Sequence, residues 1–395
     1  MRNYRWMMGL LLILMLSGCG GSSGVPEATA TPTRTPMVEE VTPTATAIAT
    51  ATPTIEPVVE PQVQFTPPPP DVNPFTGLRV ADPTLLDQLP IAIKVSNSRE
   101  ARPQSGLGSA DWVFEHLTEG RITRFTAVFY GLSPERVGSV RSGRLLDLEI
   151  PAMIGGAFAF SGGSGGVKER MRGSDLFPNR IMSPDFGAGQ LYFYRVQLQS
   201  DLAFEHTLFT NPAVLRQLAT ERGVNQRPQF PVYTAFNETP PLISADPVTY
   251  LEVNYLMNYC TAEWTYNATS GLWQRAIAGQ IHTDALTGEQ ITAANVVLIY
   301  ANHVESEFWE QMIGDSSGWI RSLEIQLWGQ GSALVFRDGQ MYSVFWKREG
   351  RDHLLTFWDG AGQPFPLKPG NTWFQMVPLN TTVQELSAGR LQFTP

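Results

Sequence analysis

The stretch from residue 20 to residue 70 limits what this chain can fold into, because it removes a long segment from any hydrophobic core. It is built mainly from Thr, Pro, Ala and Val, has no aromatic residue before Phe65, and closes on four prolines at 67–70. Such a composition cannot bury enough apolar surface to offset the entropy of ordering the chain. Proline favours an extended conformation of roughly 3.1 Å per residue, so about 50 residues reach on the order of 100 Å. We therefore expect residues 20–70 to be a disordered linker and residues 71–395 to form the folded part.

The first 19 residues have the organisation of an export signal. Arg2 and Arg5 precede an apolar run over residues 7–16, which is too short to span a bilayer and therefore predicts a signal peptide. The run ends in the sequence LSGC, which resembles the lipobox of bacterial lipoproteins. That resemblance implies cleavage before Cys19, its lipidation with diacylglycerol and palmitate, and an anchor on the extracytoplasmic face of the cell membrane. The alternative is a plain signal peptide in which the cysteine has no special role.

The charge balance argues against two classes of partner. The full chain has 28 basic and 37 acidic residues, and loss of residues 1–18 removes two arginines, which leaves 26 against 37 and a net charge of −11. An acidic protein of this kind disfavours nucleic acid and electrostatic attachment to anionic lipid. The remaining cysteine, Cys260, has no partner once Cys19 is lipidated. We therefore expect no intramolecular disulfide and a buried apolar role for Cys260.

The folded part changes character near residue 240. Before this point, apolar runs typical of strands alternate with helical patterns, which predicts an α/β domain over residues 71–240 with a mixed sheet flanked by helices. The expected strands are 91–96, 111–117, 122–130 and 157–160, and the expected helices are 143–154, 166–173 and 212–222. After residue 240, turn sequences at 267–271 and at Asp338-Gly339 separate runs rich in aromatic and β-branched residues. We expect residues 241–395 to form a β-rich domain of antiparallel hairpins.

Six longer strings follow one another along residues 72–380. They are 74–78 (PFTGL), 97–106 (NSREARPQSG), 111–124 (DWVFEHLTEGRITR), 137–144 (VGSVRSGR), 331–339 (GSALVFRDG) and 368–378 (KPGNTWFQMVP). In this order they resemble the DUF3048 family of YerB-type lipoproteins. The resemblance implies an extracytoplasmic lipoprotein with an α/β N-terminal domain and a β-rich C-terminal domain. It implies no reaction.

Five arginines fall within residues 119–144 of this acidic chain, beside runs apolar enough for core strands. They are Arg121, Arg124, Arg136, Arg141 and Arg144. Arginine stays charged and presents a planar donor fork that suits carboxylate, phosphate and sulfate groups, and burying it unpaired costs on the order of several kcal/mol. One interpretation is a structural network of ion pairs with the acidic residues of the neighbouring segment, which are Asp111, Glu115 and Glu119. A second is an anion-binding pocket, and a third is solvated surface.

The glycine-rich segment 161–166 (SGGSGG) lies between an expected strand and an expected helix. Gly162, Gly163 and Ser164 belong to a G-x-S-x-G pattern, which is also the pattern of the nucleophile elbow in α/β-hydrolases. The segment could instead place backbone N–H groups around an anion at a helix N-terminus, or form a tight structural turn. The family resemblance implies that a histidine often stands where this chain has Ser161, which weakens any mechanism that needs a base there.

His206 is the second candidate for chemistry. With Glu205 it has the residue types of an acid/base pair near neutral pH, whereas a lone histidine is often structural. Tyr192, Tyr194 and Arg195, just upstream, could form one wall of the same pocket. The five histidines lack metal-ligand spacing, and the sequence contains no P-loop or dinucleotide fingerprint. We therefore expect no metal and no cofactor.

These observations give one leading hypothesis and two alternatives. The leading hypothesis is a lipoprotein that binds an anionic cell-envelope ligand, such as a wall glycan or peptide, in an arginine-lined pocket of the α/β domain. The expected ligand-binding residues, in which Asp111 and Glu119 would orient the arginines, are Arg124, Arg141, Arg144, Asp111, Glu119, Gly162, Gly163, Ser164, Arg195 and His206. The first alternative is an envelope hydrolase or transferase that uses His206 with Ser164 or Glu119. The second is a scaffold that docks an envelope protein through the C-terminal sheet.

Overall fold

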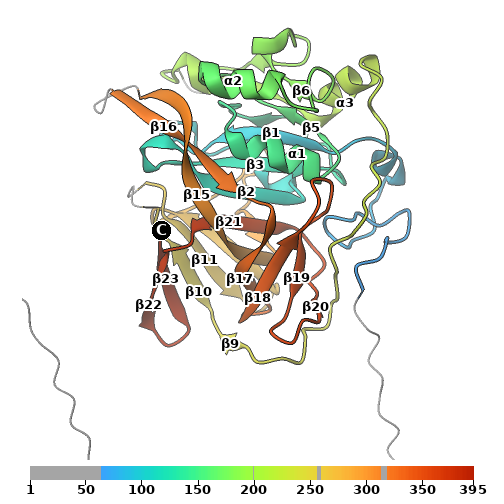
Figure 1. The fold of residues 1–395 in the computed structure, drawn as a ribbon. Helices are drawn as coiled ribbons and strands as arrows, with labels where there is room; N and C mark the ends of the chain where they lie inside the picture. The colour runs from blue at the N-terminus through green and yellow to red at the C-terminus, as the bar shows by residue number, and fades with distance from the viewer. Residues whose placement is uncertain (1–63, 199, 256–258, 313–317) are drawn as a thin grey trace, which may run out of the picture. The chain divides into compact units, whose positions relative to one another are not determined.

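The computed structural model describes residues 64–198, 200–255, 259–312 and 318–395, which lie in one compact unit (Figure 1). The expected signal peptide, Cys19 and the expected linker as far as residue 63 lie outside the described residues. No helix in the described part is long and apolar enough to cross a membrane.

The described chain is rich in strands, and its helices are short. The α-helices are α1 (Glu149–Met153), α2 (Gly165–Arg172) and α3 (Pro212–Glu221). The 3-10 helices are η1 (Pro83–Asp87), η2 (Arg99–Ala101), η3 (Leu107–Ser109), η4 (Glu119–Arg121), η5 (Leu145–Leu148), η6 (Pro184–Phe186) and η7 (Phe204–His206). The strands are β1 (Ile91–Ser96), β2 (Trp112–Leu117), β3 (Thr123–Phe129), β4 (Val137–Gly138), β5 (Ala157–Ala159), β6 (Ile181–Met182), β7 (Tyr194–Arg195), β8 (Leu208–Thr210), β9 (Asp246–Pro247), β10 (Tyr250–Val253), β11 (Ala262–Asn267), β12 (Leu272–Ile277), β13 (Gln280–Ile281), β14 (Thr292–Ala293), β15 (Asn295–Met312), β16 (Gly318–Gln326), β17 (Gly329–Arg337), β18 (Gln340–Arg348), β19 (Thr356–Trp358), β20 (Pro364–Phe365), β21 (Thr372–Pro378), β22 (Thr382–Ser387) and β23 (Arg390–Thr394).

The helices begin where the sequence supplies caps. Ser164 accepts a hydrogen bond from the Val167 backbone N–H at the start of α2, and Asn211 caps α3 in the same way, with Pro212 in its first turn. The helices expected at 166–173 and 212–222 are thereby confirmed. The helix expected over residues 143–154 is shorter, because the chain forms the 3-10 turn η5 before α1 begins.

A mixed sheet of 13 strands forms the centre of the fold. Its order is β20-β19-β18-β17-β15-β21-β2-β3-β1-β5-β6, with β16 paired to β15 and β9 to β18. β5 runs parallel to β1 and β6, β21 runs parallel to β2 and β15, and the other pairs are antiparallel. The pair of β2 with β21 joins residues 112–115 to residues 372–375, so strands from both sides of residue 240 share one sheet. A domain boundary at residue 240 stays a prediction.

The sheet buries apolar side chains on both faces, because successive residues of a strand point to opposite sides. In β2, Trp112 and Phe114 belong to one core cluster and Val113 belongs to another. In β21, Phe374 joins the first cluster and Trp373 the second. Helices α1 and α2 bury side chains in the first cluster, and α3 does so in the second. Helices therefore flank both faces, as expected, but they cover less of the sheet than an α/β pattern predicts.

A second, 7-stranded sheet covers part of the second face. Its order is β13-β12-β11-β10-β23-β22, with β14 paired to β12. Trp264 of this sheet lies against Trp373 of the large sheet, with 5.3 Å between ring centroids. The hairpins β11–β12 and β17–β18 confirm the turns expected at 267–271 and at Asp338-Gly339. Cys260 is a buried free cysteine, as expected.

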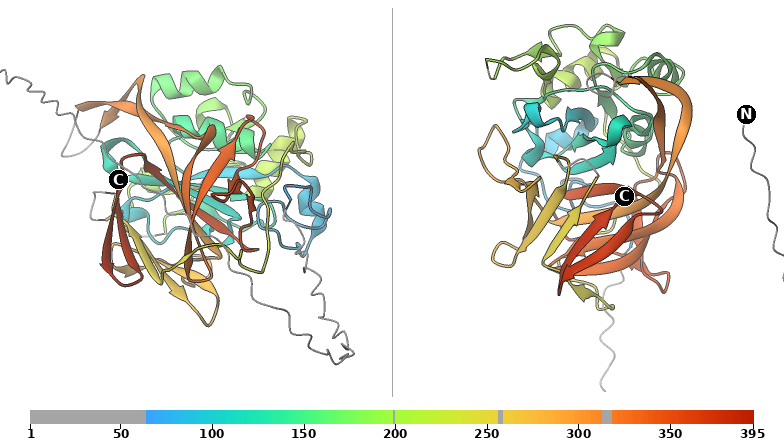
Figure 2. Two further views of the ribbon diagram at one scale, coloured as in Figure 1. Left: turned by 60° about the horizontal axis from the view of Figure 1, so that its bottom comes forward. Right: turned by 90° about the vertical axis from the view of Figure 1, so that its left-hand side faces the viewer.

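The long strand β15 forms an arm with β16, which we define as residues 302–312 and 318–326. The two strands pair from Asn302 with Gln326 to Met312 with Gly318. The arm lies beside α2 (Figures 1 and 2). Contact with α2 is close because Gly166 has no side chain, and a Cβ atom there would overlap the ring of Phe308.

Residues 64–70 lie on the folded unit, although the sequence predicts them as the end of a disordered linker. The Phe65 ring is 4.8 Å from the Trp358 ring, and Arg227 Nη1 donates a hydrogen bond to Pro70 O at 2.9 Å. The ordered part therefore begins before residue 71. The reason is that Phe65 provides apolar surface to bury, which the preceding Thr/Pro/Ala repeats lack.

Candidate functional site

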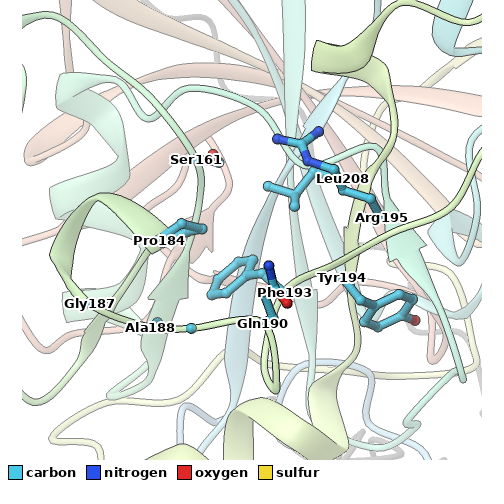
Figure 3. A pocket seen from close by; sticks show the side chains of 10 residues that line it. Ser161, Pro184, Gly187, Ala188, Gln190, Phe193, Tyr194, Arg195 and Leu208 are labelled. Atoms are coloured by element: carbon cyan, nitrogen blue, oxygen red, sulfur yellow. The ribbon is translucent and has the colours of Figure 1, made fainter.

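A pocket of about 520 Å³ lies where the parallel strands β5 and β6 end. The loop after β5 supplies Ser161, and the loop after β6 supplies the residues from Pro184 to Gln190. Figure 3 shows Pro184 and Ala188 facing Leu208 and Arg195 across the pocket. The lining residues are Ser161, Pro184, Gly187, Ala188, Gly189, Gln190, Phe193, Tyr194, Arg195 and Leu208. Ligands of open α/β sheets bind at this edge, outside the carboxyl ends of the strands.

Of the three residues expected to form one wall of the site, Tyr194 and Arg195 line this pocket and Tyr192 does not. The Arg195 guanidinium lies over the ring of Phe204, with 3.4 Å between Cζ and the ring centroid. Nη1 donates hydrogen bonds to Phe204 O at 2.5 Å and to Thr207 Oγ1 at 3.0 Å. Partial burial lowers the pKa of Arg195, which remains a cation. The side chain is thus fixed in place and keeps further N–H donors.

The Arg141 segment is bonded through its backbone to two pocket-lining residues, Ser161 and Leu208, and Arg141 Nη1 donates to Glu205 O, next to His206, at 3.4 Å. The Ser161 backbone N–H donates to Arg141 O at 3.1 Å, and the Val140 N–H donates to Leu208 O at 2.7 Å. Burial lowers the pKa of His206, and the charge of Arg141 lowers it further. His206 is therefore neutral at pH 7, beside a cationic side chain.

Three buried polar atoms in this neighbourhood have no hydrogen-bond partner among the described residues. They are Ser139 Oγ, Arg141 Nε and His206 Nδ1. Ser139 and Arg141 are two residues apart in an extended segment, so their side chains share a face. Buried polar groups are nearly always hydrogen-bonded, and unpaired ones call for a bound water or ion. Ser139 was not a predicted site residue, although its spacing of two residues from Arg141 was a usable signal.

Arg144 and Glu119 form a structural pair. Arg144 Nε lies 2.6 Å from Glu119 Oε2, and Nη2 lies 3.9 Å from Glu310 Oε2 of the arm. Glu119 also accepts hydrogen bonds from Ser322 Oγ at 3.2 Å and from the Leu323 N–H at 3.3 Å. Burial alone would raise the pKa of Glu119, but the charges of Arg144 and Arg124, together with hydrogen bonds to the carboxylate, outweigh it and hold the Glu119 pKa below its usual value. These contacts support the interpretation of Arg144 as part of an ion-pair network.

Arg124 is buried beside this network. Its Nη1 donates to Ser142 O at 3.1 Å, and no carboxylate in the described part lies within ion-pair distance of it. Burial lowers the pKa of Arg124 well below its ordinary value, and the neighbouring Arg144 and Arg141 lower it further. The three arginines are therefore neighbours, as the sequence predicts, but only Arg144 has a direct carboxylate partner.

Asp111 lies elsewhere and does not orient these arginines. It precedes β2 whereas Glu119 follows it, so about 20 Å of strand separates the two. Its carboxylate accepts hydrogen bonds from Tyr130 N, Gly131 N and Asn73 Nδ2. Burial raises the pKa of Asp111 to about 6. The expectation was wrong here because closeness in sequence along a strand is not closeness in space.

Glu115 also pairs with a different arginine from those expected. Its Oε2 lies 2.8 Å from Nη2 of Arg275, and both side chains are fully buried. Arg275 belongs to β12 of the 7-stranded sheet, so this ion pair joins the two sheets. Arg275 is far from Glu115 in the sequence, and no local sequence pattern indicated this pair.

The glycine-rich loop serves as a helix cap. The Gly162 N–H donates to Asp185 Oδ2 at 2.7 Å, so it is not free for a ligand. Gly162 and Gly163 have φ values of 87° and 151°, which favour glycine. The Ser164 hydroxyl accepts a hydrogen bond from the Val167 N–H at 3.3 Å.

The hydrolase alternative needs a hydrogen bond from His206 to Ser164 or Glu119. No such bond is present in the described part. Nor do the described residues contain a group of acidic, histidine or cysteine side chains that could hold a metal ion.

Comparisons with known proteins agree with one another. Residues 75–225 match the family described as "Protein of unknown function (DUF3048) N-terminal domain", and residues 251–374 match the "Protein of unknown function (DUF3048) C-terminal domain". The chain is 31% identical over 316 residues to a Bacillus subtilis (strain 168) protein named "Putative lipoprotein YerB", which covers 77% of this chain and 86% of that protein. The crystal structure of the YerB protein from Bacillus subtilis is similar at a TM-score of 0.61 and 27% identity, covering 78% of this chain and 96% of that one.

Proposed function

The chain belongs to the DUF3048 family, and on this premise we propose that it is a lipid-anchored extracytoplasmic protein that binds an anionic cell-envelope ligand. The anchor is Cys19, at the end of the apolar run 7–16. The anionic group binds at Ser139, Arg141 and His206, and the rest of the ligand fills the adjoining pocket of about 520 Å³.

The observation that carries this proposal is the set of unpaired buried atoms Ser139 Oγ, Arg141 Nε and His206 Nδ1. A carboxylate or phosphate oxygen accepts hydrogen bonds from a hydroxyl, a guanidinium and an imidazole, so each of these three groups has the chemistry to hold an anion. Arg141 supplies the compensating charge. His206 gains a proton more readily with the anion bound, because an opposite charge raises the pKa of an imidazole.

The adjoining pocket fits the body of such a ligand. Phe193 and Leu208 offer apolar surface, and Gln190 and Arg195 offer hydrogen-bond donors. A wall glycan or peptide that carries a carboxylate or phosphate has this combination of an anionic group and a partly apolar body. Glu119 and Arg144 take no part in the proposed site, because these two residues pair with each other.

Thermal unfolding of the chain against wall fragments, sugar phosphates and inorganic phosphate tests the site. A ligand at about 100 times its dissociation constant adds roughly 2.7 kcal/mol of stability, which raises the unfolding midpoint by a few degrees. The shift should be lost in Arg141→Gln and retained in Arg170→Gln, which removes an exposed arginine of α2. A histidine NMR titration should show the pKa of His206 rising when the same ligand binds. Equal shifts in both variants, or no shift with any ligand, would refute the site.

The anchor is tested separately in the full chain. Cys19→Ser should move the protein from the membrane fraction to the soluble fraction and abolish incorporation of labelled palmitate. A chain that stays in the membrane fraction without its cysteine contradicts the anchor but leaves the anion site standing.

A further inference from the structure

The two faces of the arm have different surroundings. Phe308 lies against Gly166 of α2, and Glu310 lies 3.9 Å from Arg144, so these side chains face the body of the unit. Trp309 stands between them in β15 and therefore points to the opposite side. It is 49% exposed, and Trp319 of β16 is 67% exposed. The outer face of the arm thus presents large apolar side chains to solvent.

Trp309 and Trp319 lie on the same face. Arg321 stands directly opposite Trp309 in the pairing of β15 with β16, and Trp319 is two residues from Arg321 along β16. Diagonal neighbours of this kind lie about 7–8 Å apart. The Arg321 guanidinium sits over the Trp309 ring, with 4.1 Å to its centroid, and Nη1 donates to Glu307 O at 2.7 Å. We call Trp309, Arg321 and Trp319 the tryptophan face.

We propose that the tryptophan face binds an uncharged polysaccharide chain. A sugar ring has apolar C–H faces and a hydroxyl edge, so it can stack on an indole while its edge is hydrogen-bonded. The Trp319 ring and the side of the Trp309 ring away from Arg321 offer two such stacking positions. Adjacent exposed apolar side chains mark binding surfaces, and Trp309 and Trp319 are diagonal neighbours on one face.

The charged groups around the tryptophan face disfavour the binding of anionic partners. The Arg321 cation is engaged by the Trp309 ring and by Glu307 O, and the exposed carboxylates of Glu305 and Glu307 lie beside it in β15. These carboxylates repel lipid and nucleic-acid phosphates, whereas an uncharged glycan meets no such repulsion.

The position of the arm in the fold suits the binding of a polymer. Figures 1 and 2 place the arm away from residue 64, where the described chain begins. A polymer that surrounds the protein reaches this face whichever way the chain is anchored. The inference does not rest on the anion site, since the two surfaces share no residue.

The test uses the full chain, insoluble chitin, and the soluble hexamers of N-acetylglucosamine and of β-linked glucose as probes. We expect retention on chitin and binding of at least one hexamer, seen as a change in tryptophan fluorescence. Trp309→Ala and Trp319→Ala should each weaken binding roughly tenfold. Phe345→Ala, which removes an exposed aromatic side chain of β18, should leave binding unchanged, as should about 0.5 M NaCl. Arg141→Gln should also bind normally, which separates this face from the anion site.

Three results would overturn the inference. The first is no binding to chitin or to either hexamer. The second is binding that persists in the double variant Trp309→Ala/Trp319→Ala. The third is binding to phosphatidylglycerol vesicles that depends on the two tryptophans while the glycans do not bind, which would make the face a lipid contact.

Discussion

Replacing Glu115 by alanine should remove a large share of the stability of the folded unit. The Glu115 carboxylate accepts hydrogen bonds from Arg275 Nη2 at 2.8 Å and from four further donors. Those donors are Thr123 Oγ1 at 2.9 Å, Gln375 Nε2 at 3.1 Å, Asn97 Nδ2 at 3.2 Å and Trp373 Nε1 at 3.3 Å. The substitution leaves the buried Arg275 cation without a counter-charge. Breaking a buried pair from one side costs about 3–5 kcal/mol, against a total stability of about 5–15 kcal/mol.

Urea unfolding followed by circular dichroism at neutral pH measures this loss, provided that the slope against urea is unchanged. Arg275→Ala should be similarly costly. The double variant Glu115→Ala/Arg275→Ala should cost less than the sum of the single variants by about 1–3 kcal/mol, because it leaves no unpaired charge. Glu385→Ala, at an exposed position of β22, is the control and should change stability by less than about 0.5 kcal/mol. A loss below about 1 kcal/mol for Glu115→Ala, or strict additivity in the double variant, would refute the reasoning.

Three further predictions follow from single contacts. Gly166→Ala should lower the free energy of unfolding, measured with urea, by about 1–3 kcal/mol, because the added Cβ overlaps the ring of Phe308. The control Gly165→Ala places its Cβ in open space and should leave stability unchanged or slightly higher. Equal effects of the two substitutions would contradict the close packing of the arm on α2. Because burial raises the pKa of Asp111 to about 6, its contribution to stability is full below about pH 4 and is lost as pH rises through about 6. Relative to Asp111→Asn, the wild type should therefore lose about 3 kcal/mol between these pH values, and parallel pH profiles would contradict the raised pKa. Phe65→Ala should release residues 64–70 from Trp358 and speed their cleavage by a broad-specificity protease, and an unchanged rate would show that the ring does not hold this segment.

Local signals in the sequence were sufficient to predict the type and position of most of the expected strands and helices. The period of apolar residues located β1, β2 and β3 to within a residue or two, and Asn211 with Pro212 marked the start of α3. These features depend on residues close together in the chain, so the sequence alone expresses them. The contacts of residues 64–70 could not be read from the sequence, because Phe65 packs against a partner nearly 300 residues away.

The candidate site was only partly predictable. Arg195 lines the pocket, as the residue types suggested, and Arg141 is bonded through its backbone to the lining residue Ser161. The roles of Asp111 and Glu119 could not be read from the sequence. Asp111 lies at the far end of β2, and Glu119 is occupied by Arg144. Which carboxylate meets which arginine depends on strand pairing and register, and these are settled by contacts between distant segments.

The sequence by itself predicted an export signal and a proline-rich linker ahead of a folded part. It also indicated that this part combines helices with many strands and that the chain resembles one family. Composition and short-range periodicity carry that information directly. Only the tertiary structure decided that β2 and β21 join both parts of the chain in one sheet, and that Arg275 rather than a nearby arginine neutralises Glu115. It also placed Trp309 and Trp319 on one outer face of the arm. The physical reason is that a buried charge or an exposed ring is defined by its neighbours in space, and in this fold many of those neighbours are far away in the sequence.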